Sequence, residues 1–138
     1  MGLAGVHLIV VSVWVGLVLA EVLLEVFAHR GLLVPAVATL HYWIDALFEI
    51  PLLLGILVTG VILTARLPDL DGLHAVKVAS GLVAIGATAF AVRVVRERRE
   101  EISLPDRVAH HQRQLVLAAV VAVPAGLVAG VIGLTYAF

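Results

Sequence analysis

Six ionisable side chains recur at four-residue intervals inside two apolar stretches of the chain. They are Glu21, Glu25, His29, His41, Asp45 and Glu49. Because residues four apart lie on one face of an α-helix, the first three form one polar stripe and the last three form another. Carboxylates and imidazoles gathered in this way are the donors of a metal site, a proton relay or an ion-pair network.

A short connection separates the two stretches, so their helices should be antiparallel neighbours with the two stripes level. We expect Glu25 to lie near His41 and Glu21 near Asp45, with Glu49 reaching deepest towards the midplane. These five residues are the metal ligands that the sequence predicts.

Other residues come to the same end of the predicted bundle. His110 or His111 of the last helix is expected to cap the site; adjacent helical residues point about 100° apart, so only one of them faces inward. Arg93 is expected to balance charge or to order a carboxylate from outside the ligand set. His29, followed by Arg30, is either a further outer partner or a residue of the headgroup region.

Exposure of these groups to lipid would carry an unfavourable insertion free energy, on the order of 2.5–3.5 kcal/mol for an Asp on insertion scales. They should therefore face the bundle interior, where four carboxylates and one arginine leave surplus negative charge in a poor dielectric. Inward-facing carboxylates and imidazoles hold dinuclear metals in four-helix bundles. We predict divalent iron, zinc or manganese, as one ion or a pair, near the cytoplasmic side.

Two other interpretations stay open. The groups could form a buried ion-pair network around Arg93 with protonated glutamates, or they could line a proton or ion pathway. The spacing E-x3-E and H-x3-D-x3-E also differs from the E-x2-H of ferritin-like di-iron bundles, so the likeness to those proteins is one of chemistry. Elemental analysis and an absorption spectrum would separate the alternatives.

A second set of residues lies at the opposite end of the predicted helices. His7 comes early in the first helix, and His74 and Lys77 begin the third. A haem b held by two histidines between helices needs such a pair, so haem b is the alternative cofactor. His74 at a helix entrance and a Lys77 that reaches the headgroups are the structural alternatives.

The stretch "HLIVVSVWVGLVLAEVLLEVFAHR" (7–30) resembles the first helix of small four-helix membrane proteins of the HemJ and CopD type. Those proteins have a histidine, a tryptophan about two turns later and a second histidine near the helix end. "LHAVKVA" (73–79) is similar to the HemJ helix that carries a functional lysine. The resemblance implies that His7 and Lys77 match the functional histidine and lysine, with haem or porphyrin chemistry and, if the chain is an enzyme, a membrane oxidoreductase.

Four apolar segments must position all these residues. Of the 138 residues, 62% are hydrophobic, and each segment approaches the roughly 20 residues that cross a bilayer as an α-helix. We predict a single all-α domain over residues 1–138, a four-helix transmembrane bundle with up-down-up-down topology. The predicted helices are 3–29, 35–67, 73–99 and 104–136.

Charge and small residues bear on orientation and partners. Arginines concentrate in the first and third connections, which by the positive-inside rule places these in the cytoplasm and both termini outside it, in the plasma (inner) membrane. The lipid bilayer is thus the expected partner, whereas a net charge of −1 gives no indication of nucleic-acid binding. Gly126 and Gly130 form a GxxxG pair that could pack within the bundle or across a homodimer. Cysteine chemistry is excluded because the chain has no cysteine.

Overall fold

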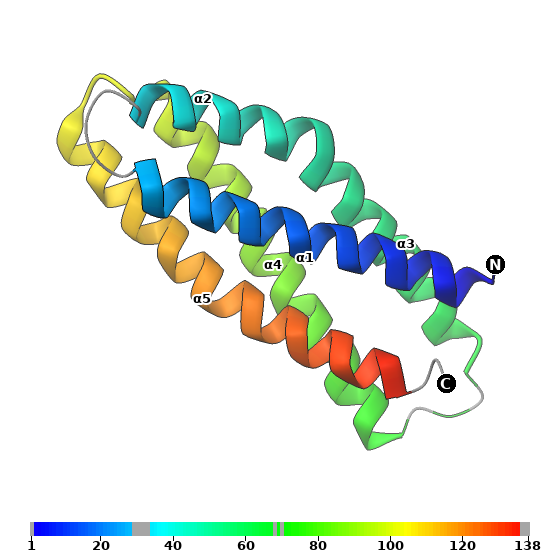
Figure 1. Cartoon of the computed structure of the whole chain (residues 1–138). Helices are drawn as coiled ribbons and strands as arrows, with labels where there is room; N and C mark the ends of the chain where they lie inside the picture. Colours follow the sequence, from blue (N-terminus) through cyan, green and yellow to red (C-terminus); the bar gives the residue numbers. More distant parts are fainter. Residues whose placement is uncertain (1, 29–33, 68, 70, 136–138) are drawn as a thin grey trace.

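The computed structural model describes residues 2–28, 34–67, 69 and 71–135, and within them it consists of four long helical rods without strands (Figure 1). The first rod is α1 (Leu3–Ala28), and the second joins α2 (Val34–Ile44), η2 (Asp45–Glu49) and α3 (Ile50–Ala65) end to end. The third and fourth are α4 (Gly72–Glu100) and α5 (Pro105–Thr135). The predicted all-α, four-helix fold is therefore confirmed.

The rods alternate in direction, so both ends of the chain lie at one end of the bundle (Figure 1). The end of α1, the start of α2 and the α4–α5 connection lie at the other. Asp71 precedes α4, and its carboxylate accepts a 2.7 Å hydrogen bond from the backbone N–H of His74. This is the N-cap arrangement that satisfies an otherwise unpaired N–H in the first turn, and it fixes where α4 begins.

Apolar side chains cover the outside of the rods, among them Leu47, Phe48, Leu54 and Leu117. All four rods are long and apolar enough to cross a membrane. Charged and polar residues are instead found among the buried ones, including Glu21, His41, Asp45, Glu49 and Arg98. An apolar outside around a polar inside is expected of a bundle whose solvent is lipid. The fold indicates a multi-pass membrane protein.

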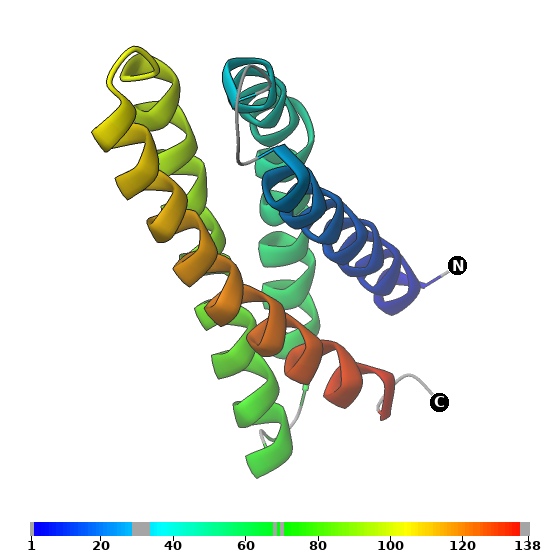
Figure 2. The same ribbon diagram turned by 60° about the vertical axis from the view of Figure 1, so that its left-hand side comes forward.

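The rods pack as two pairs, α4 with α5 along their length and α1 with the second rod (Figure 2). Trp14, Val18, Leu53 and Ala84 form a core cluster where the pairs meet near the middle. Val94, Val95 and Leu115 form a second core cluster. The buried polar residues lie between the two pairs, beyond these clusters towards the helix ends.

A wider helical turn, η2, interrupts the second rod. The Ile50 N–H donates to the Asp45 carbonyl, five residues back instead of four. Pro51 follows directly; it has no N–H, and its ring crowds the carbonyl four residues before it, which disfavours a regular α-turn there. Each four-residue step along a regular α-helix overshoots a full turn by about 40°. The wide turn offsets that drift, so His41, Asp45 and Glu49 are all buried.

Candidate metal centre

Three elements meet around the carboxylate of Glu25. Arg98 of α4 donates two hydrogen bonds to it, from Nη1 to Oε2 at 2.7 Å and from Nη2 to Oε1 at 2.6 Å. His41 of α2 approaches the same Oε1 through Nδ1 at 2.7 Å. A bidentate guanidinium and an imidazole on one carboxylate make a rigid, charge-assisted arrangement. Glu25 therefore ties α1 to α2 and to α4.

The Glu25 contact also orients the His41 ring. Because a carboxylate only accepts hydrogen bonds, Nδ1 must carry the proton, and in the neutral ring Nε2 is then an acceptor. Nε2 lies 3.7 Å from Glu21 Oε2 and 3.5 Å from Asp45 Oδ1. Both distances exceed those of a good hydrogen bond. One donor atom each from Glu21, His41 and Asp45 lies within 4.8 Å of the others, and all three residues are buried.

The carboxylates beside His41 have oxygens without hydrogen-bond partners. Among the described residues, no N–H or hydroxyl group donates to either Asp45 oxygen or to Oε1 of Glu21, although these atoms are fully buried and other carboxyl groups adjoin them. The Glu49 carboxyl group lies close enough to those of Glu21 and Asp45 to interact with them electrostatically, and the Trp14 indole adjoins Glu49. Buried, unpaired carboxylate oxygens are rare in proteins and often mark a place for an ion or water. The sequence prediction that these acids converge is confirmed.

Charge in this cluster does not balance within the described chain. Glu21, Glu25, Asp45 and Glu49 face one cationic side chain that is permanently charged, Arg98. In a medium of low dielectric, unbalanced carboxylates are strongly unfavourable. The cluster therefore requires protons or a cation.

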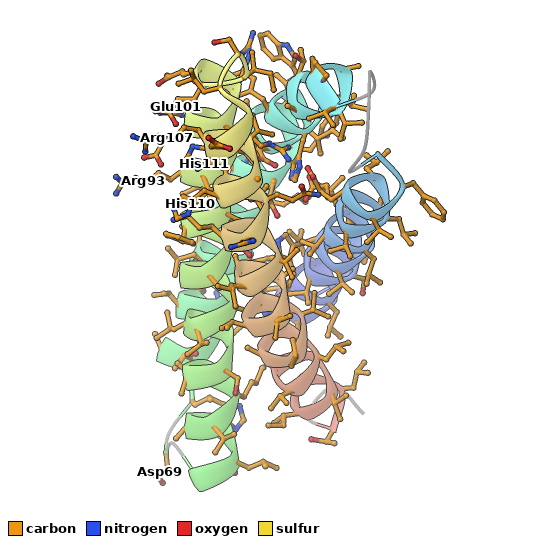
Figure 3. The ribbon with its side chains drawn as sticks, turned by 90° about the vertical axis from the view of Figure 1, so that its left-hand side faces the viewer. Asp69, Arg93, Glu101, Arg107, His110 and His111 are labelled. Carbon is orange, nitrogen blue, oxygen red and sulfur yellow. The ribbon has the colours of Figure 1, made fainter. Side chains whose placement is uncertain are left out.

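Arg98 takes the position that the sequence assigned to Arg93. The Arg93 side chain is 76% exposed, pairs with Glu97 at 2.8 Å and projects away from the bundle, whereas that of Arg98 is 3% exposed (Figure 3). Residues five apart on a helix lie about 140° apart, so the two arginines cannot share a face. The signal was present: Arg98 continues the buried face of Ala84, Thr88 and Val95.

The last helix contributes less to the cluster than expected, and this corrects the prediction of a histidine cap. His110 is exposed. His111 is buried but directs Nε2 at Glu101 (3.0 Å) and Nδ1 at Gln114 (3.2 Å), near the α4–α5 turn (Figure 3). His29 lies outside the described residues.

His7, His74 and Lys77 come together at the other end, around one cavity of about 600 Å³. Trp14, the tryptophan seven residues after His7, lines the same cavity. Their convergence fits the second site that the sequence suggested. Haem b as its occupant stays a prediction.

The absence of a side chain at Gly126 explains how the Trp14 indole fits against α5. A Cβ built on Gly126 would come within 2.8 Å of Trp14 Cζ3, so only glycine lets the indole pack against α5. At least this half of the GxxxG pair is used inside the chain.

Comparison of the chain with family models, with curated proteins and with solved structures gave no match. The resemblance to proteins of the HemJ and CopD type therefore stays a prediction.

Proposed function

We propose that this chain is a membrane metalloprotein that holds one divalent transition-metal ion between Glu21, His41 and Asp45. The observation that supports this most is the spacing of the donors. Nitrogen and oxygen ligands at about 2.0–2.2 Å from a tetrahedral ion lie roughly 3.3–3.6 Å from one another. Nε2 of His41 lies 3.5 Å from Asp45 Oδ1 and 3.7 Å from Glu21 Oε2. The first distance lies in the range for two ligands of one ion and the second lies just above it, and both are too long for a good hydrogen bond to the imidazole.

Glu25 then acts on the metal through His41. Metal-bound histidines commonly donate their second ring N–H to a carboxylate, which fixes the tautomer and raises the basicity of the ligand. Glu25 occupies that position, and both of its oxygens are held by Arg98. We therefore assign Glu25 as an orienting partner.

Glu49 completes the charge balance. Four carboxylates, one guanidinium and one divalent ion leave a single negative charge, which one proton on the neighbouring Asp45–Glu49 pair removes. Three protein donors leave a coordination position open, the arrangement of a catalytic metal site. The donor set of one imidazole and two carboxylates suits iron, zinc or manganese, and the chain has no thiolate for softer ions.

Basic residues favour a cytoplasmic position for this end of the bundle. Arg96, Arg107 and Arg113 are exposed there, whereas Arg66 at the opposite end is accompanied by Asp69 and Asp71. By the positive-inside rule the protein lies in a plasma membrane with both termini outside the cytoplasm.

This orientation can be tested by cysteine labelling. Because the chain has no cysteine, single cysteines at Arg107 and Asp69, which lie at opposite ends (Figure 3), can be labelled separately. We expect a membrane-impermeant thiol reagent added to intact cells to label Asp69→Cys alone.

Elemental analysis of detergent-purified protein tests the metal. We expect about one equivalent of iron, zinc or manganese per chain, and its loss in Asp45→Asn, which removes a ligand charge with little change of shape. Glu97→Gln is the matched control, because it removes one carboxylate charge from the exposed pair with Arg93. This control should keep the full metal content.

The opposite result is equally informative. A folded wild-type protein that contains no metal and takes up none on titration with zinc, manganese or ferrous iron would contradict the proposal. Protons would then neutralise the cluster, and the proton-pathway interpretation would be favoured. In that case Glu49→Gln should abolish pH-driven flux through the protein in vesicles without unfolding it.

A further inference from the structure

The cavity at the end of the bundle that carries the termini has an apolar body and a small polar region. Its apolar lining includes Leu53, Ile56, Ala84 and Ile85, together with several glycines of α3, α4 and α5. Its volume of about 600 Å³ lies within the roughly 300–1,000 Å³ typical of sites that enclose a small organic molecule. The ionisable groups among the described lining residues are His7, His74 and Lys77, without any carboxylate.

His7 is held so that one ring nitrogen stays available to a ligand. The Thr59 hydroxyl donates its hydrogen to the Gly55 carbonyl at 2.6 Å, so its oxygen must accept from His7 Nδ1 at 2.7 Å. The proton of the neutral ring is therefore on Nδ1, and Nε2 is an acceptor. Gly60 adjoins the ring, since a Cβ there would lie 3.4 Å from His7 Cε1. The ring is thus packed in one orientation at the cavity wall.

Lys77 supplies the positive charge of this region. Its side chain crosses to α5, where a Cβ on Gly133 would lie 3.4 Å from Cε and 3.7 Å from Nζ. Lys77 is half-buried, and its ammonium lies close enough to His7 to interact with the imidazole electrostatically. A half-buried ammonium beside an imidazole, where the described lining residues include no acid, favours an anionic group between them.

We propose that this cavity binds an amphiphilic carboxylic acid, with its head group at Lys77 and His7 and its apolar tail along the glycine-lined wall towards Trp14. A carboxylate suits both polar residues: it accepts from the Lys77 ammonium, and it accepts from Nε2 of His7 when the imidazole takes up a proton there. His7 and Trp14 are seven residues apart, so the tail extends roughly 10 Å into the bundle. The site is separate from the metal ligands and does not depend on them.

Quenching of Trp14 fluorescence by a brominated fatty acid measures this binding directly. Trp43, the second tryptophan, is exposed and does not line the cavity, so Trp43→Phe leaves Trp14 as the single reporter. In detergent-purified protein of this background we expect saturable quenching by the acid. The brominated fatty alcohol of equal chain length should bind at least roughly tenfold more weakly, because it lacks the charge-assisted contact with Lys77.

Two variants locate the head group. Lys77→Met keeps the apolar stem and removes the charge, so it should weaken binding of the acid roughly tenfold and leave the alcohol unchanged. Lys77→Arg should retain the preference for the acid. If Lys77 merely extends to the lipid headgroups, Lys77→Met will change neither ligand, and the proposal is wrong.

Two further variants locate the tail. Gly130 lines the cavity and has open space at its Cβ position, so Gly130→Leu should abolish quenching by both ligands. Gly86→Leu is the matched control, because Gly86 is exposed, outside the cavity and equally unobstructed. Equal quenching in both variants would show contact through the micelle only. A purified protein with a Soret band that is lost in His7→Ala would assign the cavity to haem and also overturn the proposal.

Discussion

At the α1–α2 end of the bundle, Glu25, His41 and Arg98 pack against one another with N···O distances of 2.6–2.7 Å. At the end that carries the termini, His7 and Lys77 instead border a cavity of about 600 Å³. The same helices α1 and α4 supply polar residues to both ends. The difference lies in what surrounds those residues: acids and an arginine at one end, glycines at the other.

This contrast separates two ways of keeping charge inside a membrane bundle. At the cluster end, Arg98 is matched by a carboxylate of the same chain, so the pair joins two helices. At the cavity end, small residues leave the space between the helices unfilled, and among the described residues the Lys77 ammonium adjoins that space instead of an acid. We therefore expect mutations at the cluster end to affect stability most and those at the cavity end to affect binding most.

Arg98→Met is the most severe test of this contrast. It leaves the largely buried Glu25 carboxylate with only His41 as partner, and breaking a buried ion pair on one side typically costs about 3–5 kcal/mol. Thermal unfolding in detergent, followed by circular dichroism, measures the loss. Arg93→Met, five residues earlier on α4, removes an exposed pair and should leave the unfolding temperature unchanged.

The double variant Glu25→Gln/Arg98→Met shows whether the charge pair is the cause. Removing both charges leaves no ion unpaired, so this variant should be more stable than Arg98→Met alone. Equal destabilisation of the single and double variants would show that Arg98 acts through packing, and the contrast between the two ends would lose its electrostatic basis.

Gly126 and Gly130 allow a matched test at the cavity end. Gly126→Ala places a methyl group 2.8 Å from Trp14, and overpacking of this kind typically costs about 1–3 kcal/mol. Gly130→Ala meets open space, so the higher helix propensity of alanine, worth up to about 1 kcal/mol, should raise stability. Thermal unfolding of both variants measures the difference. The reverse order would mean that Trp14 is not fixed against α5.

Much of this arrangement could be predicted because it depends on local spacing. Four apolar segments near the length of a membrane span imply four helices, and a four-residue interval places Glu21 and Glu25, or His41 and Asp45, on one face. The short connection then makes the two stripes face each other. The residue types and the helical period were therefore sufficient to predict that these side chains lie close together.

The misplaced arginine shows where such reasoning stops. Arg93 and Arg98 are chemically identical, and only the rotational phase of α4 decides which one is buried. That phase depends on packing against α2 and α5, which no local rule supplies. The wide turn η2 was missed for a related reason: a proline in a membrane helix is tolerated in several ways, and tertiary packing selects one of them. Pro51 was nevertheless the signal in the sequence.

Pro51→Ala gives the smallest expected effect and tests how the cluster end is built. Alanine restores a backbone N–H, so η2 should convert to a regular α-turn and rotate the helix that follows it. Asp45 and Glu49 would then lose their common alignment with His41, and we expect zinc or manganese affinity to fall roughly tenfold while the fold survives. Pro35→Ala, in the first turn of α2 where proline is readily accepted, is the control. Amide hydrogen exchange at Asp45–Glu49 detects the conversion independently of metal, so faster or unchanged exchange in Pro51→Ala would show that the wide turn is imposed by packing of the acids and not by the proline.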